Sequence, residues 1–377
     1  MDTRQMSAMA EATRLTRQGR VLEATALIQQ TLTSLTVTRP APDAPGPEDS
    51  GWIPRRRTLP RRPASSLRRP HRPASPAVKR TAGQFSAFSY SNAAGSRTYR
   101  LYVPSGGSAS GGPGGPLPLV VMLHGGTQDA ATFAAATGMN DLAEREKFLV
   151  AYPEQARSAN AGRYWNWFVP GHQRRDAGEP SLIAGITGQV TDHYGIDAAR
   201  VYVAGFSAGG AMAAVMAAAY PDLYAAVGVH SGLAYAAAND VASAFAAMRH
   251  GPSHLARSPA RPLPLIVFHG DRDATVAPAN AASLIHHVLV AASPDRRPET
   301  LPTAVTGGKV PGGHAYSRTR YQDPGGATLA ELWTIHESGH AWSGGIPHGS
   351  YTDPDGPDAS AEFIRFFHEH PAIPQAR

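Results

Sequence analysis

The stretch VYVAGFSAGGAMAAVMAAAY, residues 201–220, decides the fold of this chain. It begins with an apolar, β-branched run and ends with an alanine-rich run that favours a helix. Between the two runs, Gly205, Ser207 and Gly209 form the pattern G-x-S-x-G. The stretch therefore predicts a strand, a tight turn and a helix, with Ser207 in the turn.

Such a turn makes Ser207 a candidate nucleophile. It forces the serine into a strained backbone conformation, and the flanking glycines remove side chains that would collide with the strand and the helix. It also directs the unpaired amides of the helix N-terminus at the serine. The segment GFSAGG is not a G-x-G-x-x-G dinucleotide loop, because Ser207 stands where the second glycine would be. The alternative to a nucleophile is a purely structural turn.

The rest of the sequence extends this strand and helix into an alternating pattern that starts near residue 84. Strands are expected in RTYRLYVP, PLPLVVMLHGG, KFLVAYPE, ARVYVAGFS, AAVGVHSG, PLPLIVFHGD and ELWTIHE. Helices are expected near residues 131–146, 181–194, 208–219, 280–292 and 359–370. Runs such as LVVML are apolar without alternation, as in a parallel sheet covered by helices on both faces. Residues 84–377 are therefore predicted to form a doubly wound, mostly parallel α/β domain with functional residues at the carboxyl ends of its strands.

Composition sets further limits. The chain has 377 residues, of which 42% are hydrophobic, enough for one large core or two medium ones. It has no cysteine, which excludes a disulfide framework, a thiolate zinc site and a cysteine nucleophile. The first residues, MDTRQMSAMAEATRLTRQGR, lack the apolar core of a signal peptide, and no run is long enough for a membrane-spanning helix. We expect a cytoplasmic protein, with export without a leader as the alternative.

Two segments precede the α/β domain. Apolar residues at helical spacing predict a short helical hairpin in residues 1–35, suited to docking or oligomerisation, although nothing in the sequence specifies an oligomeric state. Residues 36–80 hold 11 Lys+Arg, 3 Asp+Glu and 10 prolines, a net charge of +8, whereas the remaining 24 Lys+Arg and 26 Asp+Glu give −2. We interpret residues 36–83 as a disordered linker, either a solvated spacer or a contact for an anionic surface such as nucleic acid or a polyanion-coated granule.

A serine nucleophile requires a base, and the base requires a carboxylate that holds its tautomer. After Ser207, the stretch LPLIVFHGDRDATV places Asp271 and Asp273 in the loop after an apolar strand. We choose Asp273, because Asp271 lies closer to the strand end and is typical of a turn-forming residue. His340 follows the strand-like ELWTI and is the candidate base. Ser207 and Asp273 are 66 residues apart, and Asp273 and His340 are 67 residues apart, so each interval leaves room for a strand and a helix.

The stretch IHESGHAW, residues 335–342, suggests a different chemistry. His336, Glu337 and His340 form H-E-x-x-H, the pattern of zinc peptidases. Zinc binding would require both histidines on one face of a helix, and Gly339, the preceding strand-like LWTI and the following SGG all oppose a helix. A third ligand is not evident. We therefore interpret His340 as a base, His336 as a strand-end histidine and Glu337 as a solvated loop residue, and expect no metal or organic cofactor.

Acyl transfer also requires donors for the oxyanion, typically two backbone amides worth ~3 kcal/mol each in the transition state. Ala208, directly after the nucleophile, is expected to supply one amide. Gly126, in LHGGT at the end of a buried strand, is expected to supply the other. The alternative for the glycine pair in LHGGT is an ordinary tight turn.

With these motifs in place, residues 84–370 resemble the polyhydroxybutyrate depolymerase family of esterases, which includes feruloyl and acetyl xylan esterases. The stretches LHGGTQDAATFAAATGMNDLAEREKFLVAYPEQ, WNWF, GEPSLIAGI, VYVAGFSAGGAMA, HGDRDATV and GHAWSGG occur in that family's order. The resemblance implies an α/β-hydrolase fold and a triad of Ser207, Asp273 and His340. It also implies hydrolysis of short-chain 3-hydroxyacyl esters, with an ester or polyester as substrate.

Feruloyl or acetyl xylan ester hydrolysis is the alternative activity. A remote alternative is a granule-binding or nucleic-acid-binding protein with a vestigial hydrolase domain. The chain departs from the family where members often have cysteines suited to a disulfide, at Gly126 and Tyr164. An extracellular location is also implied by the resemblance, although these replacements weaken that inference.

Three tryptophans lie beside these motifs. Trp165, Trp167 and Trp342 carry flat apolar rings that could line a groove for a polyester chain or an aromatic acyl group. Packing in the core is the alternative for each of them.

Overall fold

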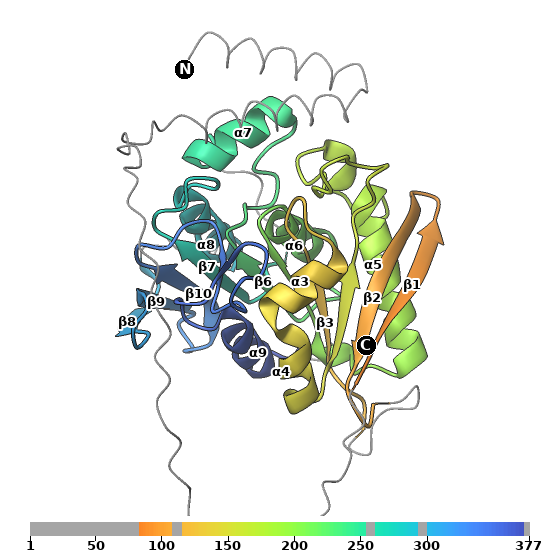
Figure 1. Cartoon of the computed structure of the whole chain (residues 1–377). Coiled ribbons are helices and arrows are strands. Elements are labelled where there is room, and N and C mark those ends of the chain that lie inside the picture. The colour runs from red at the N-terminus through yellow and green to blue at the C-terminus, as the bar shows by residue number, and fades with distance from the viewer. Residues whose placement is uncertain (1–82, 108–114, 254–260, 293–299, 373–377) are drawn as a thin grey trace, which may run out of the picture.

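The computed structural model describes residues 83–107, 115–253, 261–292 and 300–372 (Figure 1). The predicted helical hairpin of residues 1–35 lies outside these ranges. The predicted linker of residues 36–83 also lies outside them, except for Gly83. The first strand begins at Gln84, where the sequence pattern changes.

In the described part of the chain, ten strands form one sheet in the order β1-β2-β4-β3-β5-β6-β7-β10-β9-β8. Six parallel strands form its centre: β4 (Leu149–Pro153), β3 (Leu119–Leu123), β5 (Val201–Phe206), β6 (Ala226–His230), β7 (Leu265–Gly270) and β10 (Thr328–Ile335). Every residue of β3 is buried, with Leu119, Val121 and Leu123 on one face and Val120 and Met122 on the other. This two-sided burial explains apolar runs without alternation.

The two edges of the sheet are antiparallel. They are formed by β1 (Gln84–Asn92) with β2 (Gly95–Val103), and by β9 (Ala315–Gln322) with β8 (Thr303–Lys309). The strands β1, β8 and β9 were not predicted from the sequence. Their residues remain half-exposed or exposed, so they carry no continuous apolar run.

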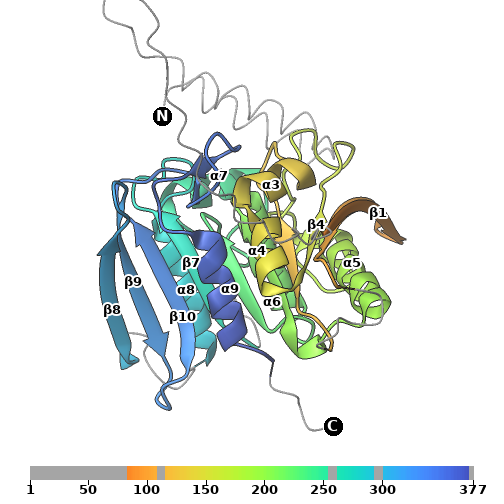
Figure 2. The same cartoon turned by 60° about the horizontal axis from the view of Figure 1, so that its bottom comes forward.

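Helices cover both faces of the sheet (Figure 2). One face carries α5 (Gly178–Tyr194), α6 (Ala208–Ala219) and α8 (Ala279–Ala292); the other carries α3 (Ala130–Thr137), α4 (Met139–Glu146) and α9 (Ala359–Glu369). The single helix expected near residues 131–146 is two helices, because Gly138 adopts a left-handed conformation, φ 62°, that ends α3. The prediction of a doubly wound, mostly parallel sheet is confirmed.

Among the described residues, one α-helix was not predicted from the sequence. It is α7 (Val241–His250), which begins at Asp240 with a capping box, since the Asp240 side chain accepts from the Ser243 amide and the Ser243 side chain accepts from the Asp240 amide. Its buried residues Ala244 and Ala247 pack against the core that contains α6 and α8. The sequence D-x-x-S before apolar residues was therefore an available signal for this helix.

The remaining elements are short. They are the 3₁₀ helices η1 (Pro170–His172) and η2 (Ala198–Arg200) and the paired strands β11 (Trp342–Ser343) and β12 (Thr352–Asp353). The pair β11–β12 fixes the loop that follows β10 against a later segment of the chain. No helix in the described ranges is both long and apolar enough to cross a bilayer.

Candidate active site

Ser207 lies in the turn between β5 and α6, with φ 55° and ψ −119°. A positive φ is uncommon for a residue other than glycine and indicates local strain. A Cβ on Gly205 would collide with the carbonyl oxygen of Gly209, and a Cβ on Gly209 would collide with that of Leu123. The two glycines therefore allow the close approach of strand and helix on which this turn depends.

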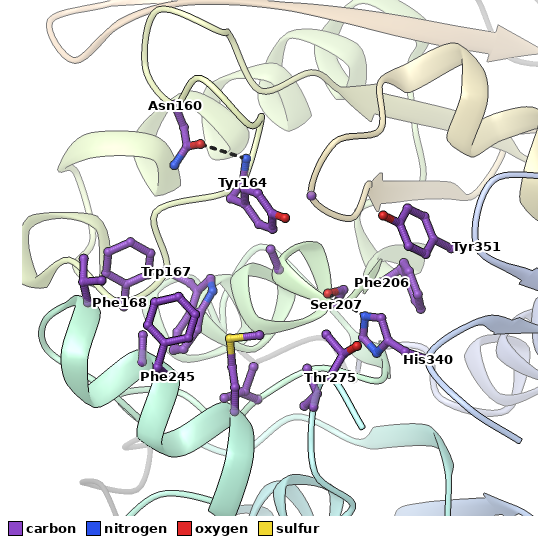
Figure 3. Close-up of a pocket in the computed structure, with 17 residues that line it drawn as sticks. Asn160, Tyr164, Trp167, Phe168, Phe206, Ser207, Phe245, Thr275, His340 and Tyr351 are labelled. Atoms are coloured by element: carbon purple, nitrogen blue, oxygen red, sulfur yellow. Dashed lines mark hydrogen bonds between the residues drawn. The ribbon is translucent and has the colours of Figure 1, made fainter. Parts of the chain in front are cut away.

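Three side chains predicted from the sequence meet beside this turn. The Nε2 atom of His340 lies 3.0 Å from the Oγ atom of Ser207, and its Nδ1 atom lies 2.7 Å from the Oδ2 atom of Asp273. Asp273 lies in the loop after β7 and His340 in the loop after β10, its parallel neighbour. Ser207 and His340 lie side by side at the rim of a pocket (Figure 3).

The Asp273 carboxylate is buried, and its Oδ1 atom accepts hydrogen bonds from the amides of Thr275 (2.9 Å) and Val276 (2.8 Å). Burial alone would raise the pKa of Asp273, but the hydrogen bonds from His340 and the Val276 amide hold that pKa below its ordinary value. Asp273 is therefore ionised at neutral pH and can accept the Nδ1 proton of His340, which leaves Nε2 to accept a proton from Ser207.

Two backbone amides near Ser207 fit an oxyanion site. Ala208 is the first residue of α6, where helix amides have no partner within the helix. Gly126 follows β3, and no acceptor among the described residues takes its N–H. Both residues line the same pocket as Ser207. A Cβ on Gly126 would collide with the ring of Tyr164, so these two positions are in direct contact.

A buried histidine anchors the loop that carries Gly126. The Nε2 atom of His124 accepts the N–H of Gln155 at 3.1 Å, so its Nδ1–H donates to the carbonyl oxygen of Gly125 at 2.8 Å. Burial lowers the pKa of His124 to about 4, which keeps the ring neutral at pH 7. This neutral tautomer fixes the backbone directly before Gly126.

A buried carboxylate continues this support. Glu179 is fully buried and accepts hydrogen bonds from the Gln155 side chain and from the amide of Asn166, the latter at 2.7 Å. The guanidinium of Arg97 lies 3.5 Å from the same carboxylate and balances its charge. The network joins the stretches GEPSLIAGI and WNWF to the loop after β4.

The pocket beside Ser207 has a volume of about 190 Å³. Trp167, Phe168 and Phe245 lie together in the part away from His340, and Met248 and Leu233 also line it. None of its lining residues, all within the described ranges, is Asp, Glu, Lys or Arg. The pocket therefore fits an uncharged, largely apolar group next to the serine.

Of the three tryptophans predicted as candidate substrate contacts, only Trp167 lines the pocket. The prediction is wrong for Trp165 and Trp342, which are fully buried. The ring of Trp165 donates to the carbonyl oxygen of His124 at 3.1 Å, and the ring of Trp342 stacks on His230. Both rings are part of the core that supports the site loops.

The histidines of the H-E-x-x-H stretch do not share a helix. The strand β10 ends at Ile335, and residues 336–341 form a turn and an irregular loop. His336 contacts Asp271, whereas His340 contacts Asp273 and Ser207. The two rings have separate partners, so the geometry that a zinc peptidase helix provides is not formed.

Several residues that line the pocket were not predicted from the sequence. Val241, Ala244, Phe245 and Met248 come from α7, the helix that was not predicted, and Tyr351 comes from the loop before β12. The α7 residues recur at helical spacing, which was the available signal. Tyr351 had no comparable signal in the sequence, because its position depends on the conformation of a loop.

Residues 97–293 match the family model described as esterase PHB depolymerase. Poly(3-hydroxyalkanoate) depolymerase C of Paucimonas lemoignei is 35% identical over 254 residues, which cover 63% of this chain and 57% of that protein. Acetylxylan esterase A of Emericella nidulans is 32% identical over 183 residues, 43% of this chain and 58% of that protein. Feruloyl esterase B of Neurospora crassa is 35% identical over 127 residues, 33% of this chain and 42% of that protein.

The solved acetyl xylan esterase from Aspergillus awamori superposes with a TM-score of 0.54 at 22% identity, over 72% of this chain and 94% of that one. This likeness shows the α/β-hydrolase fold. This chain covers about half the length of these three curated relatives, between 42% and 58%. Because the matched range of residues 97–293 covers just over half of the 377 residues, this chain belongs to the esterase PHB depolymerase family.

Proposed function

We propose that this chain is a serine ester hydrolase that cleaves short-chain 3-hydroxyacyl esters, as oligomers or amorphous polymer. The observation that carries the proposal is the hydrogen-bonded chain Ser207–His340–Asp273 at the rim of an uncharged, largely apolar pocket. The similarity to a poly(3-hydroxyalkanoate) depolymerase supports the choice of substrate class.

In the first half of the reaction, the Oγ atom of Ser207 attacks the ester carbonyl carbon while Nε2 of His340 takes the serine proton. Asp273 stabilises the imidazolium that forms. The amides of Gly126 and Ala208 donate to the carbonyl oxygen as it becomes negative, each contributing ~3 kcal/mol. The carbon–oxygen bond to the alcohol then breaks, His340 gives its proton to the departing alcohol, and the acyl group stays on Ser207.

In the second half, His340 takes a proton from water, and the resulting hydroxide attacks the acyl carbon. The same two amides donate to the second oxyanion. The bond from the acyl carbon to Ser207 Oγ breaks, and the proton on His340 returns to the serine. The products are a carboxylic acid and an alcohol, and no step requires an external cofactor.

Feruloyl or acetyl xylan ester hydrolysis is the second candidate. The relatives named feruloyl esterase B and acetylxylan esterase A support it. The aromatic side chains of Trp167, Phe168 and Phe245 in the pocket also support it, because flat rings pack well against an aromatic acyl group.

The two candidates are separated by hydrolysis of hydroxybutyrate oligomers, amorphous polyhydroxybutyrate, acetylated xylan and methyl ferulate, by the wild type and by Ser207→Ala. The proposal expects the highest kcat/KM on the hydroxybutyrate substrates and no turnover by the variant. A preference for ferulate or acetylated xylan would establish the second candidate. No hydrolysis, together with salt-sensitive polyanion binding that disappears on deletion of residues 36–80, would contradict both.

A further inference from the structure

The first histidine of the H-E-x-x-H stretch has partners that the proposed reaction does not use. The Nδ1 atom of His336 lies 3.0 Å from Oδ2 of Asp271, and its Nε2 atom lies 2.8 Å from Oγ of Ser317 in β9. These three residues form a second Ser-His-Asp chain. Asp271 shares its loop with Asp273, and His336 shares its loop with His340.

The same two loops are in direct contact along the backbone. The amide of Asp271 donates to the carbonyl oxygen of Ile335 at 3.0 Å, and the amide of Arg272 donates to that of Ser338 at 3.0 Å. In return, Oδ1 of Asp271 accepts the amide of Glu337 at 2.7 Å. The Asp271 carboxylate therefore holds the loop of His340 with both of its oxygens.

The second chain is not built as another active site. Ser317 lies within β9, opposite Gly307 of β8 and Thr334 of β10, so its backbone belongs to a regular antiparallel ladder. In such a ladder the backbone N–H groups donate to neighbouring strands, so they are not free to bind an oxyanion. The side chains of His336 and Asp271 are 39% and 38% exposed, so water also competes for them. Their geometry is suited to holding loops together.

We propose that Asp271, His336 and Ser317 are positioning residues that hold the loop of Asp273, the loop of His340 and strand β9 in one arrangement. This inference rests on the proposed function, in which His340 must lie between Ser207 and Asp273. A catalytic group displaced by about 1 Å can cost about a hundredfold in rate, so a tether on these loops affects turnover without touching substrate.

The proposal predicts a loss in kcat rather than in substrate binding. With p-nitrophenyl butyrate, Asp271→Ala and Ser317→Ala are expected to lower kcat by about tenfold and about threefold, with KM within about twofold of the wild type. Arg272→Gln is the matched control, because the Arg272–Glu337 ion pair joins the same two loops but its side chains are 68% and 70% exposed. Its kcat is expected to equal that of the wild type.

Asparagine substitutions distinguish a tether from a catalytic chain. In Asp271→Asn, the amide still accepts from Glu337 and donates to Nδ1 of His336, whose Nε2–H then donates to Ser317. The tether survives this change of tautomer, so kcat is expected to recover to within about threefold of the wild type. In Asp273→Asn the same change puts the proton on Nε2 of His340, which can no longer accept the Ser207 proton, and kcat is expected to fall by about ten-thousandfold.

Circular dichroism and thermal unfolding report whether each variant folds. If Asp271→Ala does not fold, the kcat of Ser317→Ala tests the proposal instead. Folded alanine variants with the kcat of Arg272→Gln would overturn the proposal. Equal kcat values for Asp271→Asn and Asp271→Ala would also overturn it, because the hydrogen bonds would then not matter. Retained activity in Ser207→Ala would instead refute the proposed function, so the two failures are distinguishable.

Discussion

The Nε2 atom of His340 lies within hydrogen-bonding distance, 3.0 Å, of the Oγ atom of Ser207, although 133 residues separate them in the chain. The sheet order β5-β6-β7-β10 accounts for this contact, because parallel strands deliver their following loops to one edge. Ser207 follows β5, Asp273 follows β7 and His340 follows β10. The topology thus assembles the site, and the loops determine its final geometry.

The glycines of the elbow are expected to respond differently from a glycine elsewhere in a helix. A Cβ on Gly209 would collide with the carbonyl oxygens of Leu123 and His124, which cannot move without shifting β3. Gly209→Ala is expected to lower the free energy of unfolding by about 2 kcal/mol and to abolish hydrolysis. Gly188→Ala in α5 is the control, since nothing lies within 4 Å of its Cβ, and it is expected to stabilise by about 0.5 to 1 kcal/mol. Urea unfolding of both variants tests this; equal stabilities would contradict it.

The pocket volume is expected to set the acyl-chain preference. Ala244 lines the pocket from α7, whereas Ala246 on the same helix is exposed. Leucine at position 244 would fill part of the pocket, so Ala244→Leu is expected to lower kcat/KM by about tenfold for p-nitrophenyl octanoate but to leave that for the acetate within about twofold. Ala246→Leu should leave both values unchanged. A uniform loss on both esters in Ala244→Leu would mean that the pocket does not hold the acyl chain.

One buried histidine is expected to destabilise the fold. His287 on α8 is buried, and neither of its ring nitrogens has a hydrogen-bond partner among the described residues. It faces a small apolar cavity lined by residues such as Ala214 and Leu284. His287→Leu is therefore expected to raise the free energy of unfolding by about 1 to 3 kcal/mol, whereas His286→Leu on the less buried side of the helix should change it by less than about 0.5 kcal/mol. A destabilised His287→Leu would show that the ring has an essential partner.

The stability of the fold is expected to fall in acid because of buried His124, which precedes Gly126 in the sequence. Burial lowers the pKa of His124 from 6.5 to about 4, so the unfolded chain binds a proton at this residue between those pH values while the folded chain does not. Above about pH 6.5, His124 is neutral in both states, and the free energy of unfolding does not change with its titration. As the pH decreases from about 6.5 to about 4, protonation of His124 in the unfolded chain is expected to lower the free energy of unfolding by up to about 3 kcal/mol. The pKa of Asp273 is held below 3.8, so protonation of its carboxylate lowers the free energy of unfolding only at still lower pH.

Urea unfolding at about pH 7 and about pH 5 measures this effect in the wild type and in His124→Gln. The variant removes the titrating ring, so its free energy of unfolding should depend less steeply on pH. His230, whose pKa is also lowered by burial, would account for part of the dependence that remains. Identical pH dependence in the two proteins would contradict the role of His124.

Much of this architecture was predictable because its signals are local. The apolar runs of β3 to β7 specify a covered parallel sheet, and the G-x-S-x-G pattern specifies a tight turn with a serine between strand and helix. The exposed strand β8 and the half-exposed strand β9 were missed because they are stabilised by pairing rather than by a continuous apolar face. Trp165 and Trp342 could not be assigned from sequence, since proximity to a motif does not determine on which side of a loop a ring packs.

The contact between His336 and Asp271 was also not predictable from the sequence. The sequence placed His336 at a strand end and Asp271 in a turn, but not in contact with each other, because their pairing depends on the adjacency of β7 and β10. A motif that resembled a zinc site is therefore divided between the proposed catalytic chain and the proposed tether.

The proposed reaction depends most directly on Ser207 as the nucleophile. A fluorophosphonate reagent, added to the wild type and followed by peptide mass spectrometry, is expected to modify Ser207 alone and to abolish hydrolysis of p-nitrophenyl butyrate in proportion to the modified fraction. Ser207→Ala should remain unmodified and inactive. Modification of a different residue, or full hydrolysis by protein in which Ser207 is completely modified, would contradict the account.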